Sequence, residues 1–311
     1  MTINTIVESF PMNWRNHYNA ILNNLAKFED RKYFNRSDYF GKSVLDFGGS
    51  GGQMAVALLS LGAKNATIVD PEISDEVAKK LAAIPGLLIV KGYVETAVKQ
   101  IEGHFDFIVA HSVTEHIQNL PEALDSLLLL LRSGGKFFIA HDNYYHASGH
   151  HDNMILQVGP DGKYGYQGPK CWEQGLCSIS FDFRRNTSEL PSETWFPYIW
   201  SEEDEATLSD GNCSNCNFRK RTTPWAHLLH QDSFNEIYRV PAFSTGRPNS
   251  TLNKVTPFQL KQFLIEAGFR ILLWERSFIN NEVPEQLLES LEFFSETDLK
   301  TENVFVVATR I

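Results

Sequence analysis

A glycine-rich turn that follows a short apolar strand is the feature that most constrains this fold. Residues 43–47 (Ser-Val-Leu-Asp-Phe) lead into residues 48–52 (Gly-Gly-Ser-Gly-Gly), and a helix-compatible run continues to Leu61. Glycine lets the backbone turn sharply and lets a ligand come close to main-chain N–H groups. A strand, a turn and a helix in this order are typical of a parallel α/β sheet that binds a nucleotide-like cofactor at its carboxyl edge.

Strand and helix patterns alternate through the first half of the chain. The expected strands are Ser43–Phe47, Asn65–Val69, Leu87–Lys91, Phe105–Ala110 and Lys136–Ala140. The expected helices between them are Gly52–Leu61, Asp75–Ala83, Glu95–Ile101 and Leu120–Leu131. This alternation predicts βαβ units and a parallel sheet. Residues 1–40 are expected to form a helical cap, because apolar residues recur there at helical spacing (Trp14, Tyr18, Ile21, Leu22, Leu25). Its helix either packs on the sheet edge or forms a lid over the cofactor.

The alternation stops after Ala140 and returns near the end of the chain. Residues 143–254 lack it and are expected to form an inserted subdomain that caps the substrate. Thr256 and Pro257 then open a helix that stops at Gly268. Ile271–Trp274 and Asn303–Thr309 are the expected closing strands. The fold class we predict is α/β, with a seven-stranded, mainly parallel sheet and a long irregular insertion before its last two strands.

The glycine turn does not fit a dinucleotide-binding fingerprint. That fingerprint, G-x-G-x-x-G, requires glycine where Met54 stands in one register and where Ser50 stands in the other. A dehydrogenase is therefore disfavoured.

Residues 44–52 resemble motif I of the class I S-adenosylmethionine-dependent methyltransferases, V-L-D-x-G-x-G-x-G, with Ser50 in place of the middle glycine. Further segments resemble later parts of the family in the correct order. These are residues 68–70 (Ile-Val-Asp), 91–95 (Lys-Gly-Tyr-Val-Glu), 105–117, 131–137 and 256–269. The resemblance covers about 42–142 and 255–310. It implies a Rossmann-like fold of the small-molecule methyltransferase type, with the S-adenosylmethionine-binding domain formed by residues 41–142 and 255–311.

The resemblance also implies the cofactor, S-adenosyl-L-methionine, and the residues around it. Asp46 suits the cationic methionyl end, and Asp70 is expected to accept hydrogen bonds from the two ribose hydroxyls. The backbone of Tyr93 or Val94 is expected to contact adenine, and His111 faces the methionyl end. The full predicted cofactor set is Asp46, Gly48, Gly49, Ser50, Gly52, Asp70, Pro71, Tyr93, Val94, His111 and Ser112.

Histidines gather just beyond the fifth expected strand, where this fold places the methyl acceptor. Histidine titrates near neutral pH and suits a general base on a hydroxyl, amine or thiol. The predicted catalytic candidates are His141, His146, His150 and His151. The alternatives are a polar loop without catalytic function and a metal site, although the spacing matches no metal motif. His116, which follows Glu115, is interpreted as structural.

The expected insertion contains all four cysteines, Cys171, Cys177, Cys213 and Cys216. They are interpreted as free thiols. The alternative is a zinc site in which Cys213 and Cys216 are joined by Cys171 and Cys177 or by His227 and His230. The aromatic residues of the expected insertion are predicted to form a small core or a wall around the acceptor (Trp172, Phe181, Phe183, Trp195, Phe196, Tyr198, Trp200, Trp225).

The formal net charge of −10 argues mildly against nucleic acid or an anionic membrane as the main partner. No signal peptide or membrane-spanning run is evident, so we expect a cytoplasmic protein. The expected partner is a small-molecule methyl acceptor, with no nucleic acid and no membrane; a homodimer stays open.

Three functions remain compatible with the sequence. The first is an S-adenosylmethionine-dependent methyltransferase that acts on a small molecule under the closed insertion. The second is a methyltransferase with a peptide or protein acceptor. The third is a protein that binds the cofactor without catalysis, which Ser50 and Tyr93 favour because they depart from the family pattern.

Overall fold

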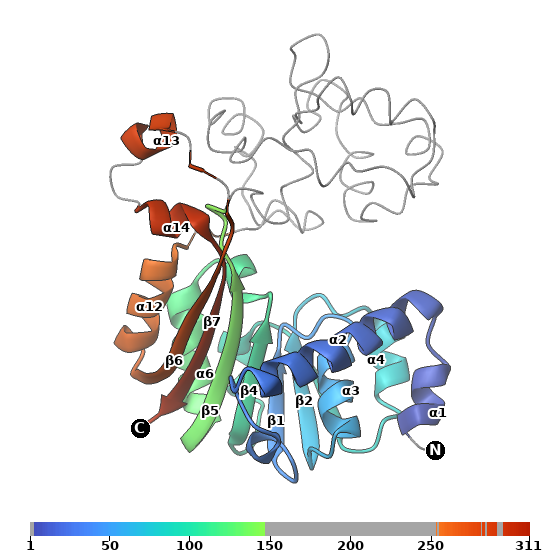
Figure 1. The fold of residues 1–311 in the computed structure, drawn as a ribbon. Helices are drawn as coiled ribbons and strands as arrows, with labels where there is room; N and C mark the ends of the chain where they lie inside the picture. The colour runs from blue at the N-terminus through green and yellow to red at the C-terminus, as the bar shows by residue number, and fades with distance from the viewer. Residues whose placement is uncertain (1–2, 147–252, 254, 281, 284, 291–294) are drawn as a thin grey trace, which may run out of the picture. The chain divides into compact units, whose positions relative to one another are not determined.

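The computed structural model describes residues 3–146, 253, 255–280, 282–283, 285–290 and 295–311. The helices of this part begin with α1 (Ile3–Glu8), α2 (Met12–Asp30), η1 (Arg36–Asp38), α3 (Gln53–Ser60), α4 (Asp75–Leu81) and α5 (Val94–Ala97). They continue with η2 (Thr114–His116), α6 (Leu120–Leu130), α12 (Pro257–Glu266), α13 (Glu285–Ser290) and α14 (Glu296–Lys300). Figure 1 draws the described helices and strands in colour along the chain.

The sheet has seven strands in the order β3-β2-β1-β4-β5-β7-β6. Their bounds are β1 (Ser43–Phe47), β2 (Asn65–Asp70), β3 (Leu87–Lys91), β4 (Phe105–His111), β5 (Leu131–Asp142), β6 (Phe269–Phe278) and β7 (Thr301–Arg310). The first five strands pair in parallel. Because parallel strands end at the same edge, the segments that follow β1, β2 and β4 are neighbours.

Strand β7 runs against its neighbours, so the sheet is mixed. Thr309, near the end of β7, donates its hydroxyl to the carbonyl of Gly135, near the start of β5, at 2.7 Å. At the other end, Ser277 of β6 accepts a hydrogen bond from the backbone N–H of Asn303 at 3.0 Å. Strands β6 and β7 therefore close the sheet as an antiparallel pair, and the predicted α/β class with a mainly parallel sheet is confirmed.

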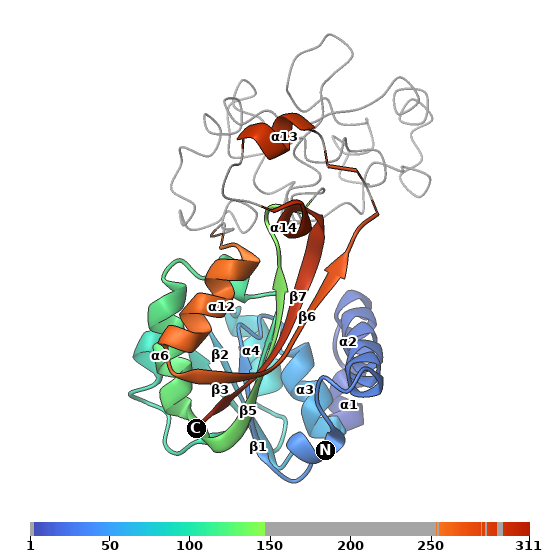
Figure 2. The ribbon, with the colours of Figure 1, turned by 60° about the vertical axis from the view of Figure 1, so that its left-hand side comes forward.

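Helices cover both faces of the sheet. Figures 1 and 2 place α6 and α12 on one side, and α2 and α3 on the other. The buried side of α2 presents Trp14, Tyr18, Ile21, Leu25 and Phe28, while α3 is buried along almost its whole length. This packing explains why the apolar spacing in residues 14–25 predicted a helix correctly.

Several predicted boundaries were wrong by a few residues. Helix α5 ends at Ala97 rather than at Ile101, and β5 begins at Leu131 rather than at Lys136. The pairing of β4 with β5 contains an irregularity near Phe105, which lets the strand start before the glycines at 134 and 135. The predicted stop of the helix at Gly268 is confirmed, because α12 ends at Glu266 and Gly268 has φ +98°.

The chain divides into two compact units. The first comprises Met1–His141, Phe258–Arg276 and Val304–Ile311, and the second comprises Asp142–Pro257 and Ser277–Asn303. In the second unit, the Asn143 side chain donates to the carbonyls of Asp298 and Thr301 at 2.9 and 2.8 Å. Residues 147–252 lie outside the described part, so the cap subdomain and its boundaries stay predictions.

Candidate functional site

The glycine turn follows the carboxyl end of β1, and its backbone enters the left-handed region at Gly48. Gly48 has φ +70° and its N–H donates to the carbonyl of Val69 at 2.9 Å. A Cβ added at Gly48 would lie 2.0 Å from Cγ2 of Val113, in the segment after β4. Ser50, at the position of the family's middle glycine, has φ +42° and adopts the same region. Glycine at position 48 therefore lets the turns after β1 and β4 meet.

Asp70 ends β2 and holds the glycine turn in place. One carboxylate oxygen, Oδ2, accepts the backbone N–H of Ser50 at 2.8 Å, and the other, Oδ1, accepts that of Glu72 at 2.7 Å. The residue is 6% exposed. A carboxylate oxygen has two lone pairs, so each oxygen retains an acceptor site for a ribose hydroxyl. The ribose contact stays a prediction, and the structure adds a role for Asp70 in holding the turn.

Asp46 lies one strand away, under the same turn. It is 2% exposed, and its Oδ2 accepts the N–H of Ala55 in the first turn of α3 at 3.0 Å. Burial, which outweighs this hydrogen bond, raises the pKa of Asp46 to about 7, and the charge of Asp70 adds to the shift. Two buried acids at one sheet edge form a site that favours a cationic ligand.

The remaining predicted cofactor residues differ in exposure. The ring of Tyr93 is 66% exposed, while Val94 is buried at the start of α5. His111 ends β4, with its ring centroid 5.8 Å from that of Phe28. Ser112 has φ +52° and donates its N–H to the carbonyl of Ala140 at 2.9 Å. Pro71 and Ser112 are partly buried. Their contacts with a cofactor stay predictions.

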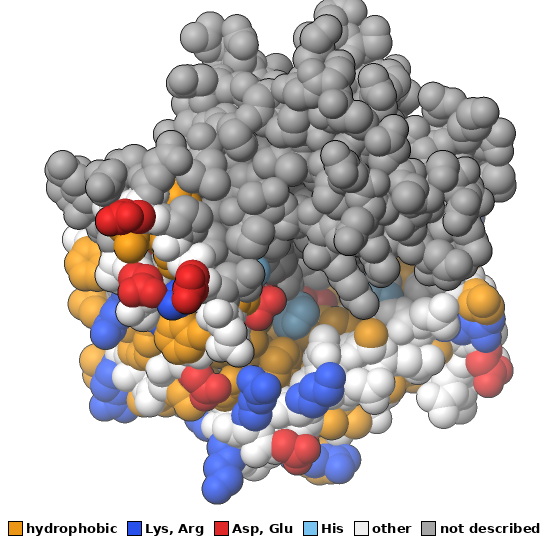
Figure 3. Space-filling model, turned by 45° about the horizontal axis from the view of Figure 1, so that its top comes forward, with side chains coloured by type: hydrophobic (Ala, Val, Ile, Leu, Met, Phe, Trp, Pro, Cys, Tyr) orange, Lys and Arg blue, Asp and Glu red, His pale blue; other side chains and the backbone are white. Residues whose placement is uncertain are grey.

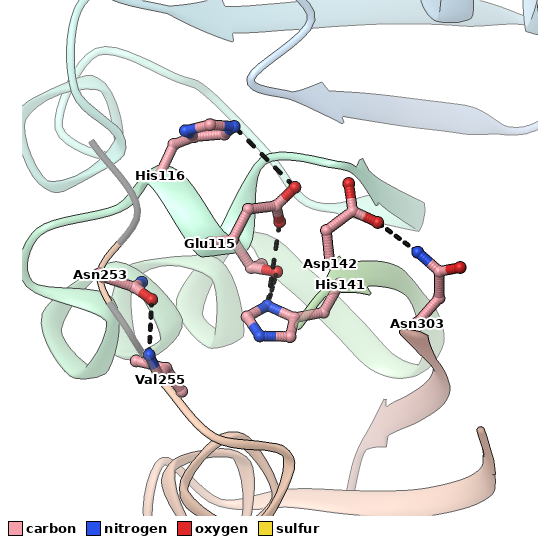
Figure 4. A network of polar contacts seen from close by, with 8 residues as sticks. Glu115, His116, His141, Asp142, Asn253, Val255 and Asn303 are labelled. Carbon is pink, nitrogen blue, oxygen red and sulfur yellow. Dashed lines mark hydrogen bonds and ion pairs between the residues drawn. The ribbon is translucent and has the colours of Figure 1, made fainter. Parts of the chain in front are cut away.

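A buried polar cluster joins the ends of β4 and β5. Figure 4 shows Glu115 between His116 and His141. Its carboxylate oxygens lie 3.9 Å from Nε2 of His116 and 3.8 Å from Nδ1 of His141. Nδ1 of His141 is also hydrogen-bonded to Oγ1 of Thr114 at 2.9 Å. His141, Thr114 and Glu115 are at most 1% exposed, so these three residues are shielded from water, whereas His116 is partly exposed.

Of these residues only His141 is among the predicted site residues, and the two residues that hold it are not. The Glu115-His116 pair was visible after the fourth strand but was interpreted as structural, and Thr114 carried no signal. His146, in the second unit, is 6% exposed. His150, His151 and the four cysteines lie outside the described part of the chain. The catalytic role of all four candidate histidines stays a prediction.

Within the described ranges, no group of three or more His, Cys, Asp or Glu side chains is arranged to hold a metal ion. Among the same residues, no helix combines the length and the apolar character needed to cross a membrane. Figure 3 shows charges of both signs scattered over the described surface, with histidine and acidic side chains beside hydrophobic ones near its centre.

The fold and this edge define an α/β protein with a cofactor site formed by a glycine turn and two acids. The chain matches the methyltransferase domain family over residues 15–203, which is more than half of its 311 residues. It belongs to that family. S-adenosylmethionine is therefore its cofactor, and the predicted family and cofactor are confirmed.

Two curated proteins illustrate the similarity. The chain is 32% identical over 120 residues to the ubiquinone biosynthesis O-methyltransferase of Caulobacter vibrioides, covering 37% of this chain and 46% of that protein. It is 36% identical over 89 residues to the ribosomal protein L11 methyltransferase of Lactobacillus acidophilus, covering 28% of each. The chain therefore spans less than half the length of these relatives.

Among solved structures, an S-adenosylmethionine-dependent methyltransferase from Mesorhizobium loti aligns with a TM-score of 0.44 and 15% identity. The alignment covers 90% of this chain and 95% of that one.

Proposed function

We propose that this chain is an S-adenosylmethionine-dependent methyltransferase that transfers a methyl group to a small-molecule acceptor. The observation that carries the proposal is the glycine turn held between Asp46 and Asp70 in a chain of the methyltransferase domain family. The acids favour a cationic cofactor, and the turn allows close approach of its ligand to the backbone.

S-adenosylmethionine supplies an activated methyl group when it is bound. The task left to this chain is to align an acceptor nucleophile and to take its proton. The histidines at and beyond the ends of β4 and β5 are the groups suited to that proton transfer, and Glu115 with Thr114 orients His141. The similarity to a ubiquinone biosynthesis O-methyltransferase favours a hydroxyl on a small molecule.

The test is a transfer assay on the full chain with labelled S-adenosylmethionine. Hydroxylated aromatic compounds, small amines, thiols and a protein mixture are offered separately, and product mass and label are followed. We expect label in a small O-methylated product formed from a hydroxylated acceptor. Binding of S-adenosylhomocysteine by calorimetry is measured in parallel. Binding without transfer to any acceptor would favour a non-catalytic protein, and absence of binding would overturn the proposal.

A protein acceptor is the second candidate. The similarity to a ribosomal protein L11 methyltransferase, which extends over 89 residues, favours a protein acceptor. The same assay distinguishes the two, because label would then precipitate with protein and stay out of the small-molecule fraction. We further propose that the protein acts in the cytoplasm, as a monomer or a homodimer, and that neither nucleic acid nor a membrane is its partner, because its formal net charge of −10 disfavours polyanionic surfaces.

A further inference from the structure

Helix α2 contacts the glycine turn through one buried side chain. The indole N–H of Trp14 donates to the carbonyl of Gly51 at 2.7 Å, although the two residues are 37 positions apart. Trp14 is 7% exposed, so water competes little for this carbonyl. The contact fixes one peptide unit of the turn from outside the sheet.

The orientation of the Gly51 carbonyl matters because the peptide group is planar. Holding that oxygen also orients the N–H of Gly52, which donates to the carbonyl of Gly49 at 2.6 Å. Ser50 and Gly52 have φ +42° and +78°, so the turn combines left-handed residues on either side of Gly51. For Ser50 this conformation costs energy and persists only when surrounding contacts hold it. Trp14 supplies one of those contacts.

The helix has other attachments that do not involve the turn. Trp14 stacks between Phe10 and Tyr18, with ring centroids 4.0 and 5.7 Å away. The hydroxyl of Tyr18 donates to Oγ of Ser60, at the far end of α3, at 3.0 Å. The hydrogen bond from Trp14 can therefore be removed while stacking and a second hydrogen bond keep α2 in place.

The family match begins at residue 15, so Trp14 and α1 precede it. We propose that Trp14 is a positioning residue for the cofactor: its hydrogen bond to Gly51 sets the glycine turn, and cofactor affinity depends on the docking of α2 against that turn. The inference rests on the proposed function and adds a residue outside the turn to the cofactor site.

The variant Trp14→Phe tests this, because it keeps the stacked ring and removes the N–H. Loss of one buried hydrogen bond should weaken S-adenosylhomocysteine binding about fivefold to tenfold by calorimetry. With an active acceptor, the KM for S-adenosylmethionine should rise while kcat changes less than about twofold. A purely structural role would lower the melting temperature and leave that KM unchanged.

Tyr18→Phe is the matched control. It removes a hydrogen bond from the same helix to the other end of α3, so it should lower stability by a similar amount and leave affinity within about twofold. Equal affinity of Trp14→Phe and the wild type, or equal losses in both variants, overturns the inference. If the wild-type protein does not bind S-adenosylhomocysteine, the proposed function itself is overturned, and with it this inference.

Hydrogen exchange on the wild-type protein gives a reading that does not depend on the variant folding. S-adenosylhomocysteine should slow exchange in residues 12–18 together with residues 48–55. Slowing in residues 48–55 alone would contradict coupling between α2 and the turn.

Discussion

The two sides of the sheet's carboxyl edge are assembled in different ways. On the β1–β2 side, Asp46 and Asp70 accept backbone N–H groups of the glycine turn and α3. On the β4–β5 side, Thr114, Glu115 and His141 contact one another through side chains. Main-chain contacts depend on the conformation of the turn and tolerate changes of side chain. Side-chain contacts require particular residues, so the second side should be more sensitive to substitution of single side chains.

The largest expected effect comes from the point where the two sides meet. Gly48→Ala adds a Cβ against Val113 and forces alanine into a left-handed conformation. Strain and overpacking should together lower the free energy of unfolding by about 3 kcal/mol, measured by denaturant titration. Gly41 has the same φ of +70° with nothing within 4 Å, so Gly41→Ala should cost about 1 kcal/mol. Equal losses would show that Val113 does not matter.

Asp70→Ala should abolish most cofactor binding. The change removes the carboxylate that holds the N–H groups of Ser50 and Glu72 and that is expected to accept the ribose hydroxyls. Two charge-assisted hydrogen bonds correspond to a loss of about 100-fold or more in S-adenosylhomocysteine affinity by calorimetry. Asp125→Ala, on the exposed side of α6, should bind as the wild type does. Unchanged binding by Asp70→Ala would contradict its role.

Asp46 should make stability depend on pH. Because burial raises its pKa in the folded state to about 7 from 3.8, the folded protein holds a proton that the unfolded chain has released in that range. Stability should therefore fall by about 2 kcal/mol between pH 5 and pH 8. Asp46→Asn should remove this decline and also weaken cofactor binding. Parallel pH profiles of the two proteins in denaturant would contradict the assignment.

Glu115→Gln addresses the opposite side and should have the smallest effect. It removes the charge that faces His116 and His141 while keeping the shape of the side chain. We expect kcat/KM for the acceptor to drop about tenfold, with S-adenosylhomocysteine affinity unchanged within about twofold. Glu122→Gln on the exposed surface of α6 is the control. If Glu115→Gln lost as much cofactor affinity as activity, the β4–β5 side would not differ in function from the β1–β2 side.

Most of the fold was predictable because its signals are local. Short runs of five residues placed β1 and β3 without error, because runs of this length between turn residues are typical of strands and too short for most helices. The prediction was weaker where tertiary contacts decide, as at the early start of β5 against β4. Helices α13 and α14 were not anticipated, because each is short and contains little apolar periodicity.

The residues of the candidate site also differ in whether local sequence signals predicted them. The glycine turn, Asp46 and Asp70 were found because a strand, a turn and an acid occur at fixed spacings in one stretch of chain. Thr114 and Glu115 were missed as partners of His141, since the residues lie 27 and 26 positions apart and meet only when β4 pairs with β5. The contact from Trp14 to Gly51 was equally invisible.

By itself, the sequence determined the α/β class, the cofactor and the acids beside the glycine turn, because these depend on residue type and short-range spacing. Only the tertiary structure decided which distant side chains hold that turn from outside and which residues surround the buried histidine. Those contacts depend on strand pairing and on the docking of α2, which bring distant residues within hydrogen-bonding distance.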